Sequence, residues 1–248
     1  MTNGHNPVVA FDAVSKSFGA KQVLSDVSWS VPEGEAVCIL GRSGTGKSVT
    51  LKLIISLLKP DQGSIRVDQD EVTQLEAPRL STVRRKIGYL FQDAALFDSL
   101  TVYENLAVPL KRLTQKSQDE IDSVVDRVLG QVGLAGDKAK MPSELSGGMR
   151  KRAGLARALM LEPKILLADE PSSGLDRITA SEIDELLLRQ KAEHKTTLIV
   201  VTHDVHGARR VADRLVVLDR GKVIAQGTVA EVEHSENEVA RKLIGSNA

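Results

Sequence analysis

A glycine-rich segment around residue 45 constrains the fold of this chain more than any other feature. Residues 41–48 read Gly-Arg-Ser-Gly-Thr-Gly-Lys-Ser, which matches the pattern G-x-x-x-x-G-K-[ST]. The apolar run Ala36–Leu40 precedes this segment, and a stretch with helical spacing, Lys47–Leu58, follows it. In such a unit the glycines let the backbone wrap around phosphates, and N–H groups at the helix start form an anion site. The pattern therefore predicts a buried parallel strand, a phosphate loop (residues 41–48) and an α/β fold.

Every residue of the phosphate loop is a candidate nucleotide ligand. We expect the Lys47 ammonium to reach the β- and γ-phosphates and the Ser48 hydroxyl to ligate Mg²⁺. The alternative is a surface turn rich in glycine and serine with a solvated lysine, and the strand before the loop and the helix after it disfavour this. The predicted nucleotide-binding residues here are Gly41, Arg42, Ser43, Gly44, Thr45, Gly46, Lys47, Ser48 and Val49.

A second apolar run ends in two acidic residues. Ile165–Ala168 is followed by Asp169 and Glu170, and ligands of open α/β sheets bind at the carboxyl ends of the strands. Asp169 is the predicted carboxylate on the Mg²⁺ side, and Glu170 is the predicted general base for an attacking water. Adjacent acids after a strand also suit the start of a helix, where the dipole favours them. The phosphate loop upstream favours the hydrolytic interpretation.

Strand-like and helical stretches alternate along the chain, as is typical of a largely parallel sheet. Between about Thr101 and Leu161 the strand signals vanish, which predicts an inserted helical block. Residues from about 229 to 248 are expected to form a short, polar helical tail near the surface. The expected strands are Val8–Val14, Val23–Val31, Ala36–Leu40, Ile65–Val67, Ile87–Phe91, Ile165–Ala168, Thr197–Val201, Leu215–Leu218 and Lys222–Ala225. The expected helices are Lys47–Leu58, Val102–Leu113, Gln118–Val132, Gly147–Leu161, Thr179–Glu193 and His206–Ala212.

Composition excludes several classes of function. Lys+Arg and Asp+Glu are both 33, so the formal net charge is +0, and aromatic residues make up 3%. Neither value favours a nucleic-acid partner. The first residues lack the pattern of a signal peptide, and no apolar run reaches the ~18 residues of a membrane span. We therefore expect any membrane role to come through a partner, and Cys38, the single cysteine, to be a small buried apolar residue.

One further motif points to a family. Leu145-Ser146-Gly147-Gly148-Met149 resembles the signature motif of ABC transporter ATPases, usually LSGGQ, and lies between the phosphate loop and the acidic strand as it does there. By itself Ser146 is also an ordinary helix N-cap, and a glycine-rich helix start is an anion site. The resemblance implies that Ser146, Gly147 and Gly148 bind the γ-phosphate held by a second copy, in a head-to-tail homodimer that sandwiches two ATP molecules.

The resemblance covers essentially the whole chain and assigns further residues. Phe18 corresponds to the aromatic that stacks on adenine, although alone it would suit a core position. Gln92 resembles the glutamine that meets Mg²⁺ and the lytic water. Asp176, in Ser173-Gly174-Leu175-Asp176, resembles the aspartate that contacts the opposite subunit. His203 resembles the switch histidine at the γ-phosphate.

These motifs together imply one nucleotide-binding domain over residues 1–248. It would have a RecA-like parallel-sheet core, an N-terminal antiparallel β subdomain and a helical subdomain over about 101–161. Its cofactors would be ATP and Mg²⁺. The implied catalytic residues are Glu170, His203, Gln92 and Lys47, and the implied metal ligands are Ser48, Gln92 and Asp169.

The resemblance also implies membrane partners. Integral permease subunits would dock near residues 93–99, with Leu96 and Phe97 as candidate contacts, and would place the chain peripherally on the cytoplasmic face of the inner membrane. Core packing is the alternative role for those two side chains. Met149, the residues that follow it and Asp-Glu-Pro-Ser-Ser-Gly-Leu-Asp-Arg resemble the ATPases of Mla/Mce-type systems for phospholipids and hydrophobic compounds, which adds a periplasmic Mce-domain protein as a partner.

Two departures and several alternatives qualify this reading. Arg177 stands where the family usually has proline, and the tail after the last strand is short. An importer of small polar solutes would carry the same motifs. An ABC protein acting on ribosomes or DNA is a further alternative, which the single cassette disfavours, and the signature motif has no use in a P-loop kinase or GTPase.

Overall fold

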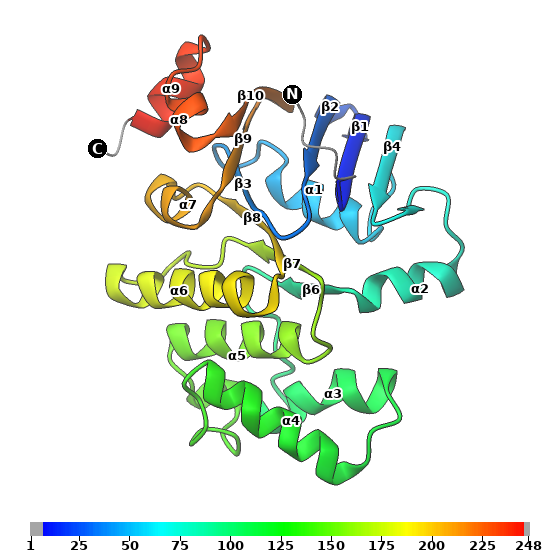
Figure 1. Cartoon of the computed structure of the whole chain (residues 1–248), viewed down its shortest axis with the longest axis vertical. Coiled ribbons are helices and arrows are strands. Elements are labelled where there is room, and N and C mark those ends of the chain that lie inside the picture. Colours follow the sequence, from blue (N-terminus) through cyan, green and yellow to red (C-terminus); the bar gives the residue numbers. More distant parts are fainter. Residues whose placement is uncertain (1–6, 246–248) are drawn as a thin grey trace.

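The structure, a computed structural model, describes residues 7–245 and contains two sheets and a group of helices (Figure 1). The sheets have the strand orders β2-β1-β4-β5 and β10-β9-β3-β8-β7-β6. The strands are β1 (Val9–Phe18), β2 (Lys21–Val31), β3 (Ala36–Leu40), β4 (Gln62–Val67), β5 (Asp70–Glu71), β6 (Ile87–Leu90), β7 (Ile165–Asp169), β8 (Thr197–Thr202), β9 (Arg214–Asp219) and β10 (Lys222–Thr228). The α-helices are α1 (Lys47–Ile54), α2 (Ala77–Arg85), α3 (Val102–Leu113), α4 (Gln118–Gln131), α5 (Gly147–Leu159), α6 (Arg177–His194), α7 (Val205–Val211), α8 (Val229–Glu233) and α9 (Glu238–Gly245).

The six-stranded sheet is mostly parallel. Its strands β9, β3, β8, β7 and β6 run parallel, with Cys38 opposite both Val200 and Leu215. Every residue of β3, β7 and β8 is buried, as expected for a parallel sheet covered on both faces. The predicted parallel core is therefore confirmed, and Cys38 is fully buried within it.

The four-stranded sheet is antiparallel, and it lies beside the parallel sheet. β1 pairs with both β2 and β4, and the Ser25 N–H donates to the Gly221 carbonyl at 2.8 Å, which joins the two sheets. Phe11 stacks on Trp29 with ring centroids 4.6 Å apart. β10 returns antiparallel to β9 through the two-residue turn Arg220–Gly221, and both turn residues have positive φ, as a type I′ hairpin turn requires.

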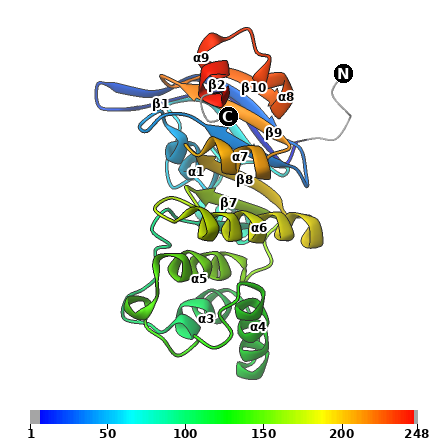
Figure 2. The same ribbon diagram turned by 90° about the vertical axis from the view of Figure 1, so that its left-hand side faces the viewer.

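Helices α3, α4 and α5 pack together on the far side of α6 from the sheets, as Figures 1 and 2 show. Thr101 and Ser117 each form a capping box, with Glu104 and Glu120, at the starts of α3 and α4. The buried faces of the three helices are continuous with the core beneath the parallel sheet. α5 contacts α3, α4, α6 and β6, so it connects the helical block to the parallel sheet.

Three local expectations are wrong. α1 ends at Ile54 and not at Leu58, because Ser56 takes φ 51° and Leu57 turns out to solvent. α2 was not expected, since its nine residues bury only Val83. The tail is less superficial than expected, because Val232, Ala240 and Ile244 are buried in the main core; residues 246–248 lie outside the described part.

The segment of the chain from residue 7 to residue 245 contains no helix that is both long and apolar enough to cross a membrane.

Candidate functional site

The phosphate loop links β3 to α1 and depends on its glycines. Gly46 is the N-cap of α1 with φ 101°, a region that residues with side chains rarely adopt. A Cβ on Gly41 would lie 2.5 Å from the Leu218 carbonyl oxygen and 2.6 Å from Thr45 Oγ1. The loop must therefore be glycine at both positions to pass between its neighbours. Arg42 and Ser43 are exposed on the loop, and Val49 packs partly against the core below it.

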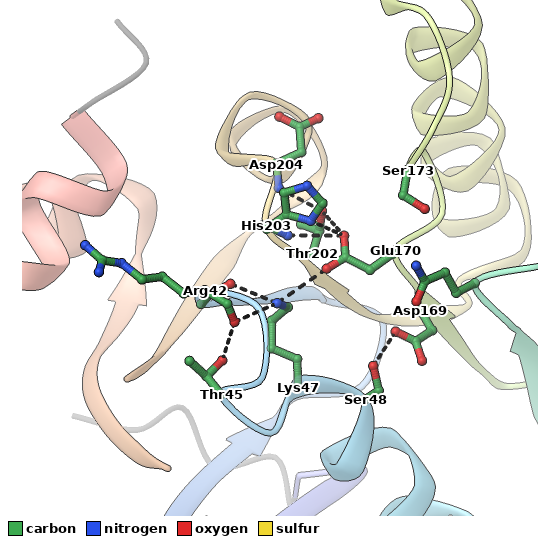
Figure 3. A network of polar contacts seen from close by, with 12 residues as sticks. Arg42, Thr45, Lys47, Ser48, Asp169, Glu170, Ser173, Thr202, His203 and Asp204 are labelled. Atoms are coloured by element: carbon green, nitrogen blue, oxygen red, sulfur yellow. Dashed lines mark hydrogen bonds and ion pairs between the residues drawn. The ribbon is translucent and has the colours of Figure 1, made fainter. Parts of the chain in front are cut away.

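Lys47 is almost fully buried, with 6% of its surface exposed. Its Nζ donates to the carbonyls of Gly41 at 2.8 Å and Arg42 at 3.2 Å. The same Nζ lies 3.4 Å from Glu170 Oε1 (Figure 3). The Lys47 ammonium therefore lies between the phosphate loop and the end of β7.

Ser48 and Asp169 meet at the start of α1. Ser48 Oγ donates to Asp169 Oδ1 at 2.8 Å, and Tyr89 Oη lies 3.5 Å from Asp169 Oδ2. Burial raises the pKa of Asp169, and the charge of Glu170 adds to that rise while the Ser48 hydrogen bond opposes it. The buried Asp169 carboxylate and the Ser48 hydroxyl together supply hard oxygen ligands, which suit Mg²⁺. Mg²⁺ usually binds one or two carboxylates and completes its coordination shell with phosphates and water. Among residues 7–245, no group of three or more His, Cys, Asp or Glu side chains is placed to hold a metal ion.

The carboxylate of Glu170 lies on the opposite side of the site from the carboxylate of Asp169, although the two residues are adjacent in sequence. Its φ is 46°, a left-handed conformation that costs a non-glycine residue roughly 1–2 kcal/mol and turns its carboxylate away from the Ser48 side. Glu170 Oε2 accepts hydrogen bonds from Thr202 Oγ1 at 3.1 Å, the His203 N–H at 3.2 Å and His203 Nδ1 at 2.9 Å. Burial raises the pKa of Glu170, but the His203 hydrogen bonds and the Lys47 charge outweigh it and leave this pKa below its usual value.

Gln92 lies just beyond β6, at the start of an exposed turn that we call the Gln92 loop (residues 91–99). Its carbonyl accepts a close hydrogen bond from Lys151 Nζ on α5. Arg157 on the same helix donates to the carbonyls of Ala95 at 2.7 Å and Ala94 at 3.0 Å. The loop approaches α5 so closely that a Cβ on Gly154 would lie 2.8 Å from Ala94 Cβ. Within the described chain, the Gln92 side chain makes no hydrogen bond to Ser48 or Asp169.

The signature loop (Leu145–Met149) begins α5. Ser146 is the N-cap and accepts from the Met149 N–H at 3.2 Å, while Ser146 and Gly147 are exposed. Gly148 is buried against α6, where an added Cβ would lie 2.4 Å from Thr179 Cγ2. Across residues 7–245, no hydrogen bond or ion pair joins the signature loop to the phosphate loop. One chain therefore carries both loops without bringing them together.

Asp176 and Phe18 lie outside the network around Glu170. Asp176 caps α6 by accepting from the N–H groups of Ile178 and Thr179, both at 3.0 Å. The hydrogen bond from the Thr179 hydroxyl is the main cause that lowers the pKa of Asp176. Phe18 ends β1 with 46% of its surface exposed, and Lys16 Nζ lies 5.5 Å from its ring centroid. Phe18 is therefore not a core residue, and part of its side chain is open to solvent.

Three residues of this site were not predicted: Tyr89, Lys151 and Thr202. Thr202 precedes His203 at the end of β8, and Tyr89 is the residue before the last one of β6. A position near the carboxyl end of an expected parallel strand was therefore the signal that could have identified both residues. A cleft of about 460 Å³ opens beside Glu170, Thr202 and His203 and runs between α6 and α7.

Comparison with known proteins identifies the family of this chain. Residues 24–173 match the family model described as ABC transporter. The chain is 42% identical over 236 residues to the probable ribonucleotide transport ATP-binding protein mkl of Mycobacterium tuberculosis, covering 95% of this chain and 66% of that protein. It is 42% identical over 228 residues to the methionine import ATP-binding protein MetN 1 of Paraburkholderia xenovorans, covering 92% and 66%. The chain thus spans slightly less than two thirds of the length of these relatives.

A solved structure agrees with the sequence comparison. The dimeric post-hydrolysis state of the ATP-binding cassette MJ0796, bound to ADP and phosphate, superposes with a TM-score of 0.82 at 35% identity, over 89% of this chain and 98% of that one. The chain belongs to the ABC transporter family.

Proposed function

We propose that this chain hydrolyses ATP at the edge of the parallel sheet and that Glu170 acts on the attacking water. The observation that carries the proposal is the placement of two carboxylates on opposite sides of one site. Asp169 meets Ser48 at 2.8 Å, and Glu170 meets Lys47 at 3.4 Å and His203 at 2.9 Å. Hydrolysis needs these two functions separated, one carboxylate on the metal side and one on the water side.

In this proposal the chain's own groups act as follows. Lys47 and the N–H groups at the start of α1 bind the β- and γ-phosphates, and Phe18 stacks on adenine. Glu170, ionised because its pKa is low, orients a water as a hydrogen-bond acceptor. It takes the proton as the water oxygen bonds to the γ-phosphorus and ADP leaves. His203 donates to the γ-phosphate oxygens, where negative charge develops.

Ser48 and Asp169 would hold Mg²⁺, with Gln92 as a further ligand once its loop moves toward them. Bound there, the metal neutralises phosphate charge during transfer. The raised pKa of Asp169 supports this, because a buried carboxylate is stabilised in its charged form by a cation.

The complete site would form between two copies of the chain. The exposed N–H groups at the start of α5 suit an anion, and the signature loop makes no contact of its own with the phosphate loop. We therefore place Ser146, Gly147 and Gly148 on the γ-phosphate held by the partner copy, with Asp176 at the same interface. MJ0796, which is similar over nearly its whole length, is a dimer.

Coupling to a membrane permease would pass through the Gln92 loop. Phe97 has 52% of its surface exposed, and Arg157 lies 5.8 Å from its ring centroid. Leu96 is half-buried and packs against the core. Phe97 is therefore the better candidate to contact a cytoplasmic helix of the permease, which would bring the chain to the cytoplasmic face of the inner membrane.

We favour a phospholipid or other hydrophobic compound as the cargo. The support is the resemblance of Met149 and the following Arg150, Lys151 and Arg152 to Mla/Mce-type ATPases. Relatives at equal identity carry names for ribonucleotide transport and for methionine import, so identity alone does not choose a cargo. The methionine-import relative keeps a polar-solute importer as the second candidate.

The cargo proposal is tested by purifying the tagged chain with its membrane partners in mild detergent. Mass spectrometry should find a permease, an Mce-domain protein and bound phospholipid. Reconstituted ATPase activity should rise with phospholipid and not with methionine. A solute-binding protein in the complex, or stimulation by methionine, would overturn the lipid assignment and leave the ATPase proposal intact.

The hydrolysis proposal is tested by Glu170→Gln. We expect ATP binding to remain within about twofold while turnover falls at least about 100-fold, because the amide orients water but accepts no proton. Single-turnover assays should show the loss of hydrolysis, and gel filtration with ATP should find a trapped dimer. Glu185→Gln, an exposed position on α6, is the matched control. Undiminished turnover in Glu170→Gln would remove Glu170 from this role.

A further inference from the structure

Lys151 is buried in the first half of α5 with 7% of its surface exposed. It and Lys47 are the buried lysines among residues 7–245. Lys47 lies near a carboxylate, but within the same residues Lys151 has no carboxylate oxygen within ion-pair distance of its Nζ. Burying an ammonium is unfavourable unless its donors are satisfied, so the acceptors around Lys151 must be arranged specifically for it.

Those acceptors are neutral and come from different segments. Lys151 Nζ donates to the Gln92 carbonyl, to the Glu170 carbonyl at 3.0 Å and to Ser173 Oγ at 3.4 Å. An ammonium has three N–H donors, and here each has an acceptor. Burial lowers the pKa of Lys151, while the nearby carboxylates of Asp93, Glu170 and Asp169 act in the opposite direction.

The segments that Lys151 joins are those that carry the proposed chemistry. Gln92 begins the loop beyond β6, Glu170 ends β7, and Ser173 lies in the segment that leads to Asp176 and α6. A side chain that only fastened α5 to the sheet could take all of its acceptors from one strand. Lys151 instead fixes the main chain of two proposed active-site residues relative to each other.

Its position on α5 adds a second link. Lys151 lies five residues after Ser146, about 7 Å along a helix. A shift of the start of α5 therefore moves the Lys151 ammonium and, through it, the carbonyls of Gln92 and Glu170. Lys151 therefore connects α5, the helix that begins at the signature loop, directly to the main chain of both Gln92 and Glu170.

We propose that Lys151 is a positioning residue for ATP hydrolysis, which sets the placement of Gln92 and Glu170 and links it to the position of the signature loop. This inference rests on the proposed function of that site. It assigns Lys151 no contact with nucleotide, so its loss should change the rate of the chemical step and leave nucleotide affinity unchanged.

The test is Lys151→Met in the whole chain, with Lys242→Met, an exposed position on α9, as the matched control. We expect kcat to fall about 10- to 100-fold, because small misplacements of reacting groups have effects of this size. The Kd for ATP, measured by calorimetry, should stay within about twofold and the Tm within a few degrees of the control. Lys151→Arg, which keeps the charge and the donors, should recover most of the lost kcat.

Wild-type kcat in Lys151→Met would overturn the proposal, and so would parallel losses of kcat, affinity and Tm, which indicate a structural role only. If the Met variant does not fold, Lys151→Gln takes its place. Its two amide donors leave one acceptor unpaired, and we expect lowered kcat with unchanged Kd; wild-type kcat there would again overturn the proposal.

Failure of this inference is distinguishable from failure of the proposed function. If Glu170→Gln abolishes turnover and Lys151→Met does not reduce it, the inference fails and the proposed function stands. If Glu170→Gln hydrolyses ATP normally while Lys151→Met is slow, the role of Glu170 fails, and Lys151 acts through Gln92.

Discussion

The phosphate loop and the signature loop are both glycine-rich helix starts, but their surroundings differ. Around the phosphate loop, Lys47 binds loop carbonyls, Ser48 binds Asp169, and Glu170 lies 3.4 Å from the Lys47 ammonium. At the start of α5, Ser146 caps one N–H, and Gly148 packs on Thr179. No titratable group of the described chain bonds to the signature loop in the way that Glu170 and Asp169 bond to the phosphate loop.

This difference teaches what each loop can do alone. The phosphate loop has charged and hydroxyl groups for phosphate and metal, so one chain can bind nucleotide. The signature loop offers only helix N–H groups and one serine, which suffice to stabilise a phosphate that is already bound elsewhere. Binding should therefore be a property of one chain, and hydrolysis a property of two.

The strongest test of this comparison uses one variant in each loop. Lys47→Ala should abolish both ATP binding and hydrolysis, whereas Ser146→Arg should leave ATP binding by a single chain within about twofold and lower hydrolysis at least about 100-fold. Mixed in equal amounts, the two variants should recover about a quarter of wild-type turnover. Half the dimers would be mixed, and each would have one intact composite site.

The mixture also defines what would contradict the comparison. Normal hydrolysis by Ser146→Arg alone would place the whole reaction within one chain. The mixture could also be as inactive as each variant alone, although gel filtration detects dimers. That result would mean that one composite site cannot work while the second site of the same dimer is disabled.

A smaller effect is expected at Gly154, where α5, the helix that begins at the signature loop, packs against the Gln92 loop. In Gly154→Ala the new Cβ would lie 2.8 Å from Ala94 Cβ and 3.0 Å from Ala94 Cα, which pushes the Gln92 loop away from α5. We expect kcat to fall roughly 3- to 10-fold with unchanged ATP affinity. Gly130→Ala on α4 is the control, since its Cβ meets nothing within 4 Å and alanine favours the helix by about 0.5–1 kcal/mol. Equal kcat in both variants would show that the loop tolerates displacement.

The smallest effect concerns Asp184, on α6 in the cleft between α6 and α7. Burial, together with the charge of Asp204, raises its pKa from 3.8 to about 6, while Arg210 and His206 oppose the rise. The folded state therefore holds this proton more tightly than the unfolded chain, and its contribution to stability decreases as pH rises from about 4 to about 6. Above that range the ionised carboxylate opposes folding.

Asp184→Asn should consequently raise the Tm by a few degrees at pH 8 and by less at pH 4.5. Thermal melts at the two pH values check this, with Glu185→Gln on the same helix as control. A Tm difference that is independent of pH would show that Asp184 does not titrate in this range.

The sequence predicts β3, the phosphate loop and β7 well because the determinants of these elements are local. Residues 41–48 carry their own backbone requirements, and the apolar run Ile165–Ala168 places Asp169 and Glu170 at a strand end without reference to distant residues. The different roles proposed for Asp169 and Glu170 require their carboxylates to point in different directions. Those directions depend on the backbone angle at Glu170 and on the hydrogen bonds from Thr202 and His203 at the end of β8, which no local sequence pattern contains.

The elements that were missed depend on packing. The apolar spacing of Ile54, Ile55 and Leu58 predicts a longer α1, but the left-handed turn at Ser56 ends it. α2 has too few apolar residues to be recognised by periodicity. Lys151 stands between Arg150 and Arg152, and such a basic run predicts a solvated helix face. Only the Gln92 loop and the segment at Ser173, folded over α5, bury the middle residue.

At Glu170, the residue that the left-handed backbone favours differs from the residue that the proposed chemistry needs. Judged by stability alone, glycine or asparagine would suit φ 46° better than glutamate. A screen of position 170 for thermal stability and a screen for turnover should therefore select different residues. The most stable form of this cassette is then not its active form, and engineering for stability should leave this one strained residue untouched.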